Sequence, residues 1–508
     1  MNYSKLICLR ILGSALGLLA LSGSITLALA ADPEKPNIVL VLCDDLGYGD
    51  IQCLNPEKGK ILTPAVDRLA SQGMIFTDAH SGSSVCSPTR YGLLTGRYSW
   101  RTHLQQGVVQ GWAPCLIDSQ RPTVATYLKQ QGYHTAILGK WHLDFQYEDP
   151  ETGKTLKAES KKQKALPPVG SKIPDGPLQH GFDYFHGFHH AGSMKSVVED
   201  DSVIMHDDEI NMLPRLSSKA VEYIDGRAKT NRENGEQPFF LYVPYGSPHT
   251  PILPTKAWQG KSGLGKYADF VMETDDGFGD ILEALDRNGF TDNTLVIFSS
   301  DNGCSRVVNI SGLQKKGHYP SAHMRGSKAD LWDGGHRVPF VVRWPGNVKP
   351  GSTSDQLICL TDVMATCSDL LKAPLPKGTA EDSVSFLPAL SGEEITSTRK
   401  GVVHHSISGH FSYRQGKWKL LLARGSGGWT SPKEGQAKKA DAPIAQLYDL
   451  ETDPAETTNL YEKQPEVAQR LLDQLKSDIE RGRSTDGAEA KNDLSEIILW
   501  KSEKKPKP

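Results

Sequence analysis

Short apolar runs alternate with longer helix-like segments over most of this chain. Continuous apolar runs bounded by turn residues predict strands buried on both faces. Alternation with helices predicts a mainly parallel sheet, because parallel strands need a long crossover connection, usually a helix. The clearest predicted strands are residues 37–42, 133–138, 239–243, 294–298 and 338–343. One clear predicted helix begins with Thr63 as its N-cap and Pro64 in its first turn, and another spans about 267–287.

The pattern changes after about Leu390. Residues 411–421 predict a hairpin that turns at Gln415-Gly416, residues 447–450 another strand, and residues 465–481 an amphipathic helix. A chain of 508 residues is too long for one ordinary core. We therefore expect an α/β fold with two domains. The first, 31–395, has a large, mostly parallel mixed sheet flanked by helices, and the second, 396–508, is a smaller α+β domain with an antiparallel sheet and a basic tail.

The first thirty residues predict a signal peptide, 1–30. Lys5 and Arg10 come before or at the start of an apolar run that ends in Ala28-Leu29-Ala30, a small-x-small cleavage site. The alternative is an uncleaved N-terminal anchor. No later stretch is apolar enough to span a bilayer, and a net charge of -3 gives no sign of a nucleic-acid partner. We therefore expect an exported protein without a membrane span after cleavage.

Eight cysteines are present, and Cys8 lies in the predicted signal peptide. Export permits disulfides, but sequence does not reveal pairing. Cys359 and Cys367 are expected to share a helix, where roughly 12 Å would separate them, too far for a bond. We expect isolated thiols for most of the six cysteines other than Cys8 and Cys86, namely Cys43, Cys53, Cys115, Cys304, Cys359 and Cys367.

Acidic and amide side chains directly follow two of the predicted strands. Asp44 and Asp45 follow the first strand, and Asp301 and Asn302 follow the strand at 294–298. In an open α/β sheet, ligands bind beyond the carboxyl ends of the strands. Hard oxygen ligands suit Ca²⁺ or Mg²⁺. The two pairs together predict a divalent metal site, although either pair alone would be an ordinary turn or helix cap.

Cations and imidazoles follow two further strands. Lys140 and His142 come after the strand that ends at residue 138, and His249 comes after the strand at 239–243 and a short loop. A lone histidine is more often structural than functional. Two titratable histidines at strand ends beside a predicted metal site are harder to explain as structural, so both stay candidates for the site.

A fifth segment, 83–96, contains a candidate nucleophile. Ser87 is expected to cap a helix that Pro88 opens, which places Cys86 at a helix N-terminus, where backbone N–H groups favour an anion. Arg90, four residues on, faces the same side. A nucleophile, a helix end and a guanidinium are thus predicted to meet at one tetrahedral oxyanion. The alternative is a simple reactive or buried cysteine.

At Cys86-Ser87-Pro88-Thr89-Arg90 the sequence resembles the type I sulfatase family, whose core motif is Cys-x-Pro-x-Arg. The run from Leu94 to Arg97 also fits. Further segments match in the family's order, namely residues 44–50, 139–142, 248–251, 301–303 and 325–339. The resemblance covers roughly residues 35–460 and implies an alkaline-phosphatase-like fold and a sulfuric ester hydrolase.

The resemblance implies that a formylglycine-generating enzyme oxidises Cys86 to formylglycine, whose hydrate attacks sulfur. It implies one divalent metal, usually Ca²⁺ with Mg²⁺ as the alternative, held by Asp44, Asp45, Cys86, Asp301 and Asn302. It places five further side chains around the sulfate and the diol, namely Arg90, Lys140, His142, His249 and Lys328. Among these groups, Asp301 is the candidate base, His249 or Lys328 protonates the leaving alcohol, and His142 assists sulfate release.

The substrate is expected to be a sulfated carbohydrate. Residues 98–101 and 181–187 look like those of bacterial sulfatases that act on sulfated polysaccharides, which favours 6-sulfated N-acetylgalactosamine or galactose. The candidate sugar contacts are Trp112, His186, His189, His190 and Arg325. The mature chain has one N-glycosylation triplet, at Asn309, which favours a bacterial periplasmic or secreted enzyme. Two alternatives stay open: a phosphonate monoester or phosphodiester hydrolase of the same superfamily, and a sulfated-glycan binding protein without turnover.

Overall fold

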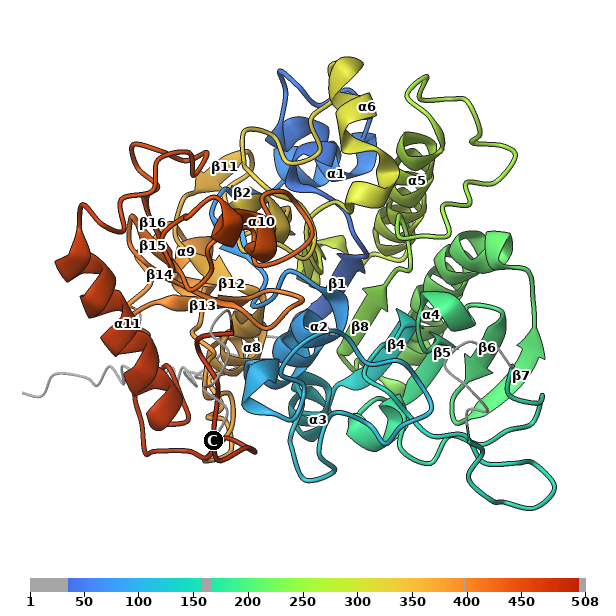
Figure 1. The fold of residues 1–508 in the computed structure, drawn as a ribbon. Coiled ribbons are helices and arrows are strands. Elements are labelled where there is room, and N and C mark those ends of the chain that lie inside the picture. Colours follow the sequence, from blue (N-terminus) through green and yellow to red (C-terminus); the bar gives the residue numbers. More distant parts are fainter. Residues whose placement is uncertain (1–34, 158–165, 397, 502–508) are drawn as a thin grey trace, which may run out of the picture. The chain divides into compact units, whose positions relative to one another are not determined.

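The predicted mostly parallel sheet is the centre of the fold. The computed structural model describes residues 35–157, 166–396 and 398–501, so the predicted signal peptide lies outside the described residues. Ten strands form a mixed sheet in the order β11-β2-β10-β9-β1-β8-β4-β5-β6-β7 (Figure 1). Their bounds are β1 Asn37–Cys43, β2 Met74–Phe76, β4 His134–Lys140, β5 Tyr184–Phe188, β6 Ser196–Glu199, β7 Ser202–His206, β8 Phe239–Pro244, β9 Thr294–Ser300, β10 Phe340–Arg343 and β11 Ser352–Ser354.

Five neighbouring strands, β9-β1-β8-β4-β5, are parallel. β1 lies between β8 and β9, with Val39 beside Leu241 on one side and Val296 on the other. The strand predicted at 338–343 is β10, and it runs antiparallel to β9. The sheet is therefore mixed, and the carboxyl ends of its five central strands meet at one edge.

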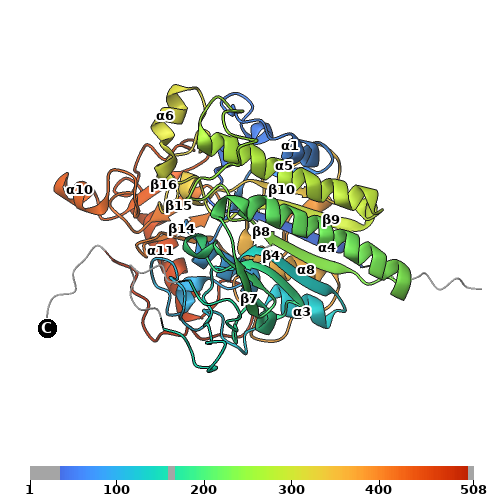
Figure 2. The ribbon, with the colours of Figure 1, turned by 90° about the vertical axis from the view of Figure 1, so that its right-hand side faces the viewer.

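Helices cover both faces of the sheet, as predicted. Successive residues of a strand point to opposite faces. Ile38 and Leu40 join the core that α2, α3 and α8 cover, whereas Val39 and Val41 join the core that α1, α4 and α5 cover (Figure 2). The helices of the described residues are α1 Pro64–Ser71, α2 Cys86–Thr95, α3 Val124–Gln130, α4 Met212–Asn234, α5 Lys266–Arg287, α6 Ile310–Lys315, α7 Asp333–His336, α8 Val363–Leu370, α9 Leu387–Leu390, α10 Glu434–Lys439 and α11 Pro465–Glu480.

The start of α1 is stabilised from another helix. Thr63 occupies the N-cap position, but its side chain makes no cap hydrogen bond and instead accepts one from the Gln52 amide at 3.0 Å. The buried carboxylate of Asp275 on α5 accepts from the amides of Ala65 and Val66 at 2.9 and 3.0 Å. A tertiary contact thus supplies the cap that local sequence assigned to Thr63.

The C-terminal region contains the expected antiparallel sheet. Its strands are β13 Val402–His405, β14 Phe411–Gln415, β15 Trp418–Leu421 and β16 Gln446–Asp449. The predicted hairpin is β14-β15, with Gly416 at φ 55° in its turn. α11 contacts both strands. Residues from Lys35 onward cluster as one compact unit, so the domain boundary predicted at 395/396, between α9 and β13, stays a prediction.

The seven cysteines in the described part of the chain are free thiols. The shared helix expected for Cys359 and Cys367 was wrong, since Cys359 ends the short strand β12, Ile358–Cys359, and Cys367 lies on α8. None of the helices in the described ranges is both long and apolar enough to cross a membrane.

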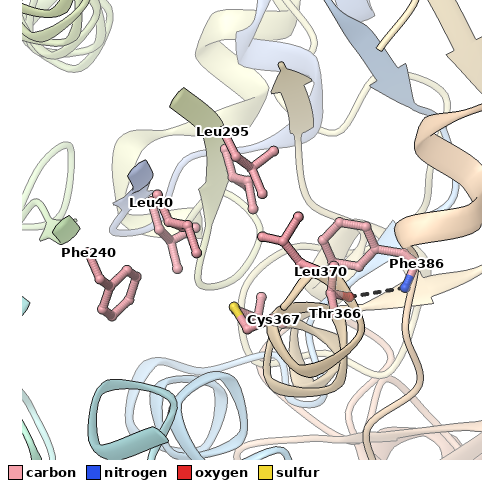
Figure 3. Close-up of a pocket in the computed structure, with 10 residues that line it drawn as sticks. Leu40, Phe240, Leu295, Thr366, Cys367, Leu370 and Phe386 are labelled. Atoms are coloured by element: carbon pink, nitrogen blue, oxygen red, sulfur yellow. Dashed lines mark hydrogen bonds between the residues drawn. The ribbon is translucent and has the colours of Figure 1, made fainter. Parts of the chain in front are cut away.

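An apolar cavity lies in the core beside Cys367 (Figure 3). Leu40, Phe240 and Leu295 approach it from the sheet, and Thr366 on the same helix accepts a hydrogen bond from the Phe386 amide at 3.0 Å. Its volume of about 10 Å³ leaves no more room than one water needs. It is a packing void, and none of the predicted site residues lines it.

Candidate active site

The polar segments that follow the central strands meet at one edge of the sheet. Asp44 and Asp45 follow β1, Asp301 and Asn302 follow β9, and Lys140 ends β4. His249 follows β8 after a short loop, and Cys86 begins α2. The structure therefore brings together residues from five separate segments, as the parallel-strand argument predicted.

Three carboxylates and one amide form the oxygen-rich part of this site. Asp44, Asp45, Asp301 and Asn302 are each no more than 2% exposed. The Asn302 side-chain amide donates to Asp45 Oδ1 at 2.8 Å, and the Asp45 amide donates to Asp301 Oδ1 at 3.2 Å. Asn302 Oδ1 is buried and accepts no hydrogen bond from the described residues. This set fits a hard divalent cation, because oxygen donors converge and one of them is left without a partner.

Each carboxylate is paired with its own cation. Lys140 Nζ lies 2.5 Å from Asp44, and Lys328 Nζ lies 2.5 Å from Asp45. The third pair joins Arg90 to Asp301 Oδ2, at 2.7 Å from Nη2 and 3.1 Å from Nε. Three charges of each sign therefore balance in a buried site, as burial of ions requires.

Burial and the neighbouring charges shift the pKa values of Asp44 and Asp301 in opposite directions. Burial alone would raise the pKa of Asp44, but Lys140, His249 and Arg90 outweigh it and hold that pKa well below its usual range. Burial and the neighbouring Asp44 charge raise the pKa of Asp301 to about 6. Asp301 is thus better suited than Asp44 to accept a proton.

Cys86 lies at the centre of the site. Its Sγ is 3.5 Å from Asp44 Oδ1 and 3.5 Å from Lys328 Nζ. Burial raises the pKa of the Cys86 thiol to about 12, so the unmodified side chain is protonated at neutral pH. A thiolate is the nucleophilic form of cysteine, and this surrounding therefore does not favour direct thiol catalysis.

The helix start at Cys86 was predicted with the wrong cap. Val85 is the N-cap residue and Cys86 is the first helical residue. Ser87 lies inside the first turn, where its hydroxyl accepts from the Val109 amide at 3.3 Å. The helix N-terminus still lies at Cys86, since the backbone is extended at Val85 and helical from Cys86 onward.

The two predicted imidazoles differ in exposure. His142 is buried, its Nε2 lies 3.2 Å from the Val109 carbonyl, and its Nδ1 has no hydrogen-bond partner among the described residues. Burial lowers the pKa of His142 well below its usual value. The His249 side chain is 20% exposed, and its Nε2 lies 3.7 Å from Asp45 Oδ2. His249 is thus the more exposed of the two imidazoles.

The candidate sugar contacts separate into two groups. The rings of His189 and His190 lie 6.0 and 5.8 Å from the ring of His142, beside the site. Trp112 packs on Tyr147. Two other candidates are engaged in packing and pairing, since His186 lies 3.5 Å from Glu199 and Arg325 lies over the Trp332 ring at 3.6 Å. Sugar contact stays a prediction for all five.

Some supporting residues carry no strong sequence signal. Asp144, with a φ of 62°, accepts from the Gly111 amide at 2.6 Å and lies 3.1 Å from His189 Nε2. Ser300 accepts from the Leu46 amide at 3.1 Å and so orients the loop after β1. A positive φ at a residue other than glycine signals a constrained backbone, but it is visible only in the structure.

Comparisons with known proteins agree with this geometry. A family model described as Sulfatase matches residues 36–373. An N-acetylgalactosamine-6-O-sulfatase of Bacteroides thetaiotaomicron is 32% identical over 495 residues, covering 87% of this chain and 93% of the relative. Arylsulfatase A of Bos taurus is 30% identical over 487 residues, covering 89% of each chain.

Solved structures show the same fold. A Bacteroides thetaiotaomicron protein described as a 6S-sulf, from work on the metabolism of multiple glycosaminoglycans, matches with a TM-score of 0.73 and 29% identity, covering 87% of this chain and 99% of that one. Ps i-CgsB, solved with k-i-k-neocarrahexaose, matches with a TM-score of 0.70 and 23% identity, covering 92% of this chain and 97% of that one. At that identity, the second likeness supports the fold alone.

Proposed function

Because this chain belongs to the sulfatase family and is a sulfuric ester hydrolase, we propose that it removes 6-O-sulfate from N-acetylgalactosamine or galactose units of a sulfated carbohydrate. The observation that carries the chemistry is the arrangement around Cys86, where three carboxylates are each paired with one cation. The 6-position and the sugar rest on the N-acetylgalactosamine-6-O-sulfatase that shares 32% identity.

Asp44, Asp45, Asp301 and Asn302 would hold one divalent metal, Ca²⁺ by preference. The unpartnered Asn302 Oδ1 and the buried carboxylates supply the hard oxygen donors that Ca²⁺ requires. Bound there, the metal supplies positive charge that acidifies the nucleophile's hydroxyl and screens its approach to an anion. With the carboxylates engaged in this way, Lys140, Lys328 and Arg90 are able to turn their donors toward the sulfate oxygens.

Oxidation of Cys86 to formylglycine would supply a hydrated aldehyde, with one hydroxyl to attack sulfur and a second to expel sulfate afterwards. Cys86 is only 2% exposed, so a formylglycine-generating enzyme needs the segment before it folds. The raised pKa of the thiol supports this assignment, because unmodified Cys86 would be a poor nucleophile.

The remaining charged and titratable side chains of the site have separate proposed roles. Arg90, Lys140 and Lys328 balance the charge on the sulfuryl oxygens, an effect that is strong in a water-poor site. His142 Nδ1, which is buried and has no hydrogen-bond partner among the described residues, would accept a proton from the second hydroxyl during sulfate release. His249, the more exposed imidazole, would protonate the leaving alcohol.

Replacing His249 by alanine is expected to slow sugar sulfates more than aryl sulfates. An alkyl alcohol needs a proton to leave, whereas a phenolate leaves without one. We expect turnover of a 6-sulfated sugar to fall by about 10²- to 10⁴-fold, with a clearly smaller loss on 4-nitrophenyl sulfate. Lys328→Ala serves as the comparison and should slow both substrates, since Lys328 contacts Asp45 and Cys86. Equal losses of turnover on both substrates for His249→Ala would contradict the proposal that His249 is the general acid.

Sulfate release from a matched panel tests the substrate proposal. We expect release from 6-sulfated N-acetylgalactosamine or galactose and much slower release from 4-sulfated N-acetylgalactosamine. Preference for the 4-sulfate would contradict the proposed specificity for 6-O-sulfate but not the sulfatase activity itself. A preference for a matched phosphodiester by orders of magnitude would favour the phosphodiester or phosphonate monoester hydrolase. Tight glycan binding without any sulfate release would favour a binding protein.

Export to the bacterial periplasm or the medium is part of the proposal. It rests on residues 1–30, with Lys5 and Arg10, the apolar run and Ala28-Leu29-Ala30. N-terminal sequencing of the protein from a periplasmic fraction should give Ala31 as the first residue. Retention of Met1 in a membrane pellet would show an uncleaved anchor.

A further inference from the structure

A second cluster of metal-ligating side chains is made of His80, His336 and His404. They come from three segments, the short strand β3 Ala79–His80, helix α7 and strand β13. All three side chains are fully buried, and one ring nitrogen of each lies within 4.8 Å of the others. None of them belongs to the proposed sulfatase site.

In each ring, one nitrogen belongs to the cluster and the other, called the outer nitrogen, has a hydrogen-bond partner elsewhere. The partner of the outer nitrogen identifies the tautomer of the ring. His80 Nε2 lies 2.8 Å from Asp78 Oδ1, and His336 Nε2 lies 3.0 Å from the Leu331 carbonyl. His404 Nδ1 lies 3.1 Å from the Ser81 carbonyl. Carbonyls and ionised carboxylates only accept hydrogen bonds, so each of these nitrogens carries the proton. Arg414 Nη1 also lies 3.1 Å from His80 Nε2, but its shorter contact, at 2.7 Å, is with Asp78 Oδ1, the same oxygen that accepts from His80 at 2.8 Å.

Asp78 is an acceptor because it is ionised. Both nitrogens at the end of the Arg414 guanidinium donate to its carboxylate at 2.7 Å. The Nε2 proton of His80 is therefore directed at Asp78.

The inner nitrogen of each ring, which belongs to the cluster, consequently carries a lone pair and no proton. His80 Nδ1 and His336 Nδ1 are 3.0 Å apart, and His404 Nε2 is buried with no hydrogen-bond partner in the described part of the chain. Two lone pairs at that distance repel unless a positive charge lies between them. A cation bound by these inner nitrogens would remove that repulsion and give His404 Nε2 a partner.

We propose that His80 Nδ1, His336 Nδ1 and His404 Nε2 bind one borderline divalent cation of the zinc type. Neutral imidazole is the ligand that such ions prefer, whereas Ca²⁺ prefers the oxygen donors around Cys86. A histidine that binds a metal characteristically donates its other ring N–H to a carboxylate or a backbone carbonyl, and all three rings do so here.

Binding requires a small movement of the rings. His336 and His404 are stacked, with ring centroids 3.8 Å apart and planes 11° apart. Two stacked rings do not both point an in-plane lone pair at one ion, so binding turns one ring about χ2, a soft torsion in histidine. No fourth histidine, cysteine or carboxylate joins the group within the described ranges, which leaves one position for a water molecule or a small anion.

The proposed ion would join two active-site segments to the C-terminal sheet. His80 precedes the Cys86 segment, and His336 follows Lys328. His404 lies on β13 beside His405. The backbone carbonyl of His405 accepts from the Ser83 hydroxyl at 2.8 Å and from the Ser84 amide at 3.0 Å. The ion would therefore stabilise the frame around the nucleophile without contacting substrate.

Metal analysis of the full mature chain tests this proposal. The protein is freed of metal with a chelator, dialysed against ZnCl₂ with CaCl₂ present, then against buffer, and its metals are counted by mass spectrometry. We expect one equivalent of zinc in the wild type and less than a tenth of that in His404→Gln and His80→Gln. His405→Gln, a change at the buried neighbour on β13, should keep its zinc.

Two outcomes would overturn the proposal: no zinc above background in the wild type, or equal zinc in wild type and His404→Gln. If the variants fail to fold, Co²⁺ replaces Zn²⁺ in the wild type, and X-ray absorption reports the ligands. Three imidazole nitrogens support the site, and an all-oxygen shell overturns it. These readouts are independent of sulfatase activity.

Discussion

Replacing Cys86 by alanine is expected to lower sulfate release by about 10⁴-fold or more, because the side chain that becomes the nucleophile is lost. The protein should remain folded. Alanine is smaller than cysteine, and the ion pairs that surround Cys86, such as Lys140 with Asp44, do not depend on its sulfur. Release of sulfate from a 6-sulfated sugar and thermal unfolding are the two measurements.

Cys86→Ser sharpens this test. Serine has one hydroxyl, so it is able to accept a sulfuryl group but has no second hydroxyl to expel it. We expect a single turnover and an enzyme whose mass is increased by one sulfuryl group. Cys53→Ser, at a half-buried cysteine outside the site, is the control and should keep full activity. An active wild-type enzyme whose Cys86 peptide carries an unmodified thiol would contradict the mechanism.

Replacing Asp301 by asparagine is expected to remove both activity and stability. Asp301 binds the Arg90 guanidinium through two nitrogens, and both side chains are no more than 1% exposed. Removing one partner of such a pair leaves the buried Arg90 charge with only Asp44, 3.8 Å away, as its counter-charge, which costs up to about 3–5 kcal/mol. Denaturant unfolding of the variant measures that cost. Calcium titration should show weakened binding, since one of the proposed ligands has lost its charge.

Asp473→Asn is the matched control, because Asp473 is an exposed carboxylate on α11 whose side chain is 60% accessible. It should change neither stability nor calcium binding, as surface ion pairs contribute little. Treatment of the wild type with a chelator should abolish sulfate release, and CaCl₂ should restore it. Full activity in protein shown to be free of metal would exclude the metal role of Asp44, Asp45 and Asp301.

The architecture was largely predictable from local patterns. Runs such as residues 37–42 are apolar without interruption, and only a strand buried on both faces accommodates them, so the structure confirms β1, β4, β8, β9 and β10. The errors concern residues whose partners are distant. Ser87 was predicted as a helix cap, but Val85 takes that position, and the α1 cap comes from Asp275, more than two hundred residues along the chain.

The sequence by itself determined which chemical groups lie at the carboxyl edge of the sheet, because strand ends carry their neighbours there whatever the rest of the chain does. Only the tertiary structure decided which charges are paired. Lys140 and Asp44 are 96 residues apart, Arg90 and Asp301 are 211 apart, and Lys328 and Asp45 are 283 apart. The His80 cluster likewise joins three separate segments. Short-range patterns encode the direction and burial of each strand, whereas side-chain pairing depends on strand order and register, which arise only when the whole sheet assembles.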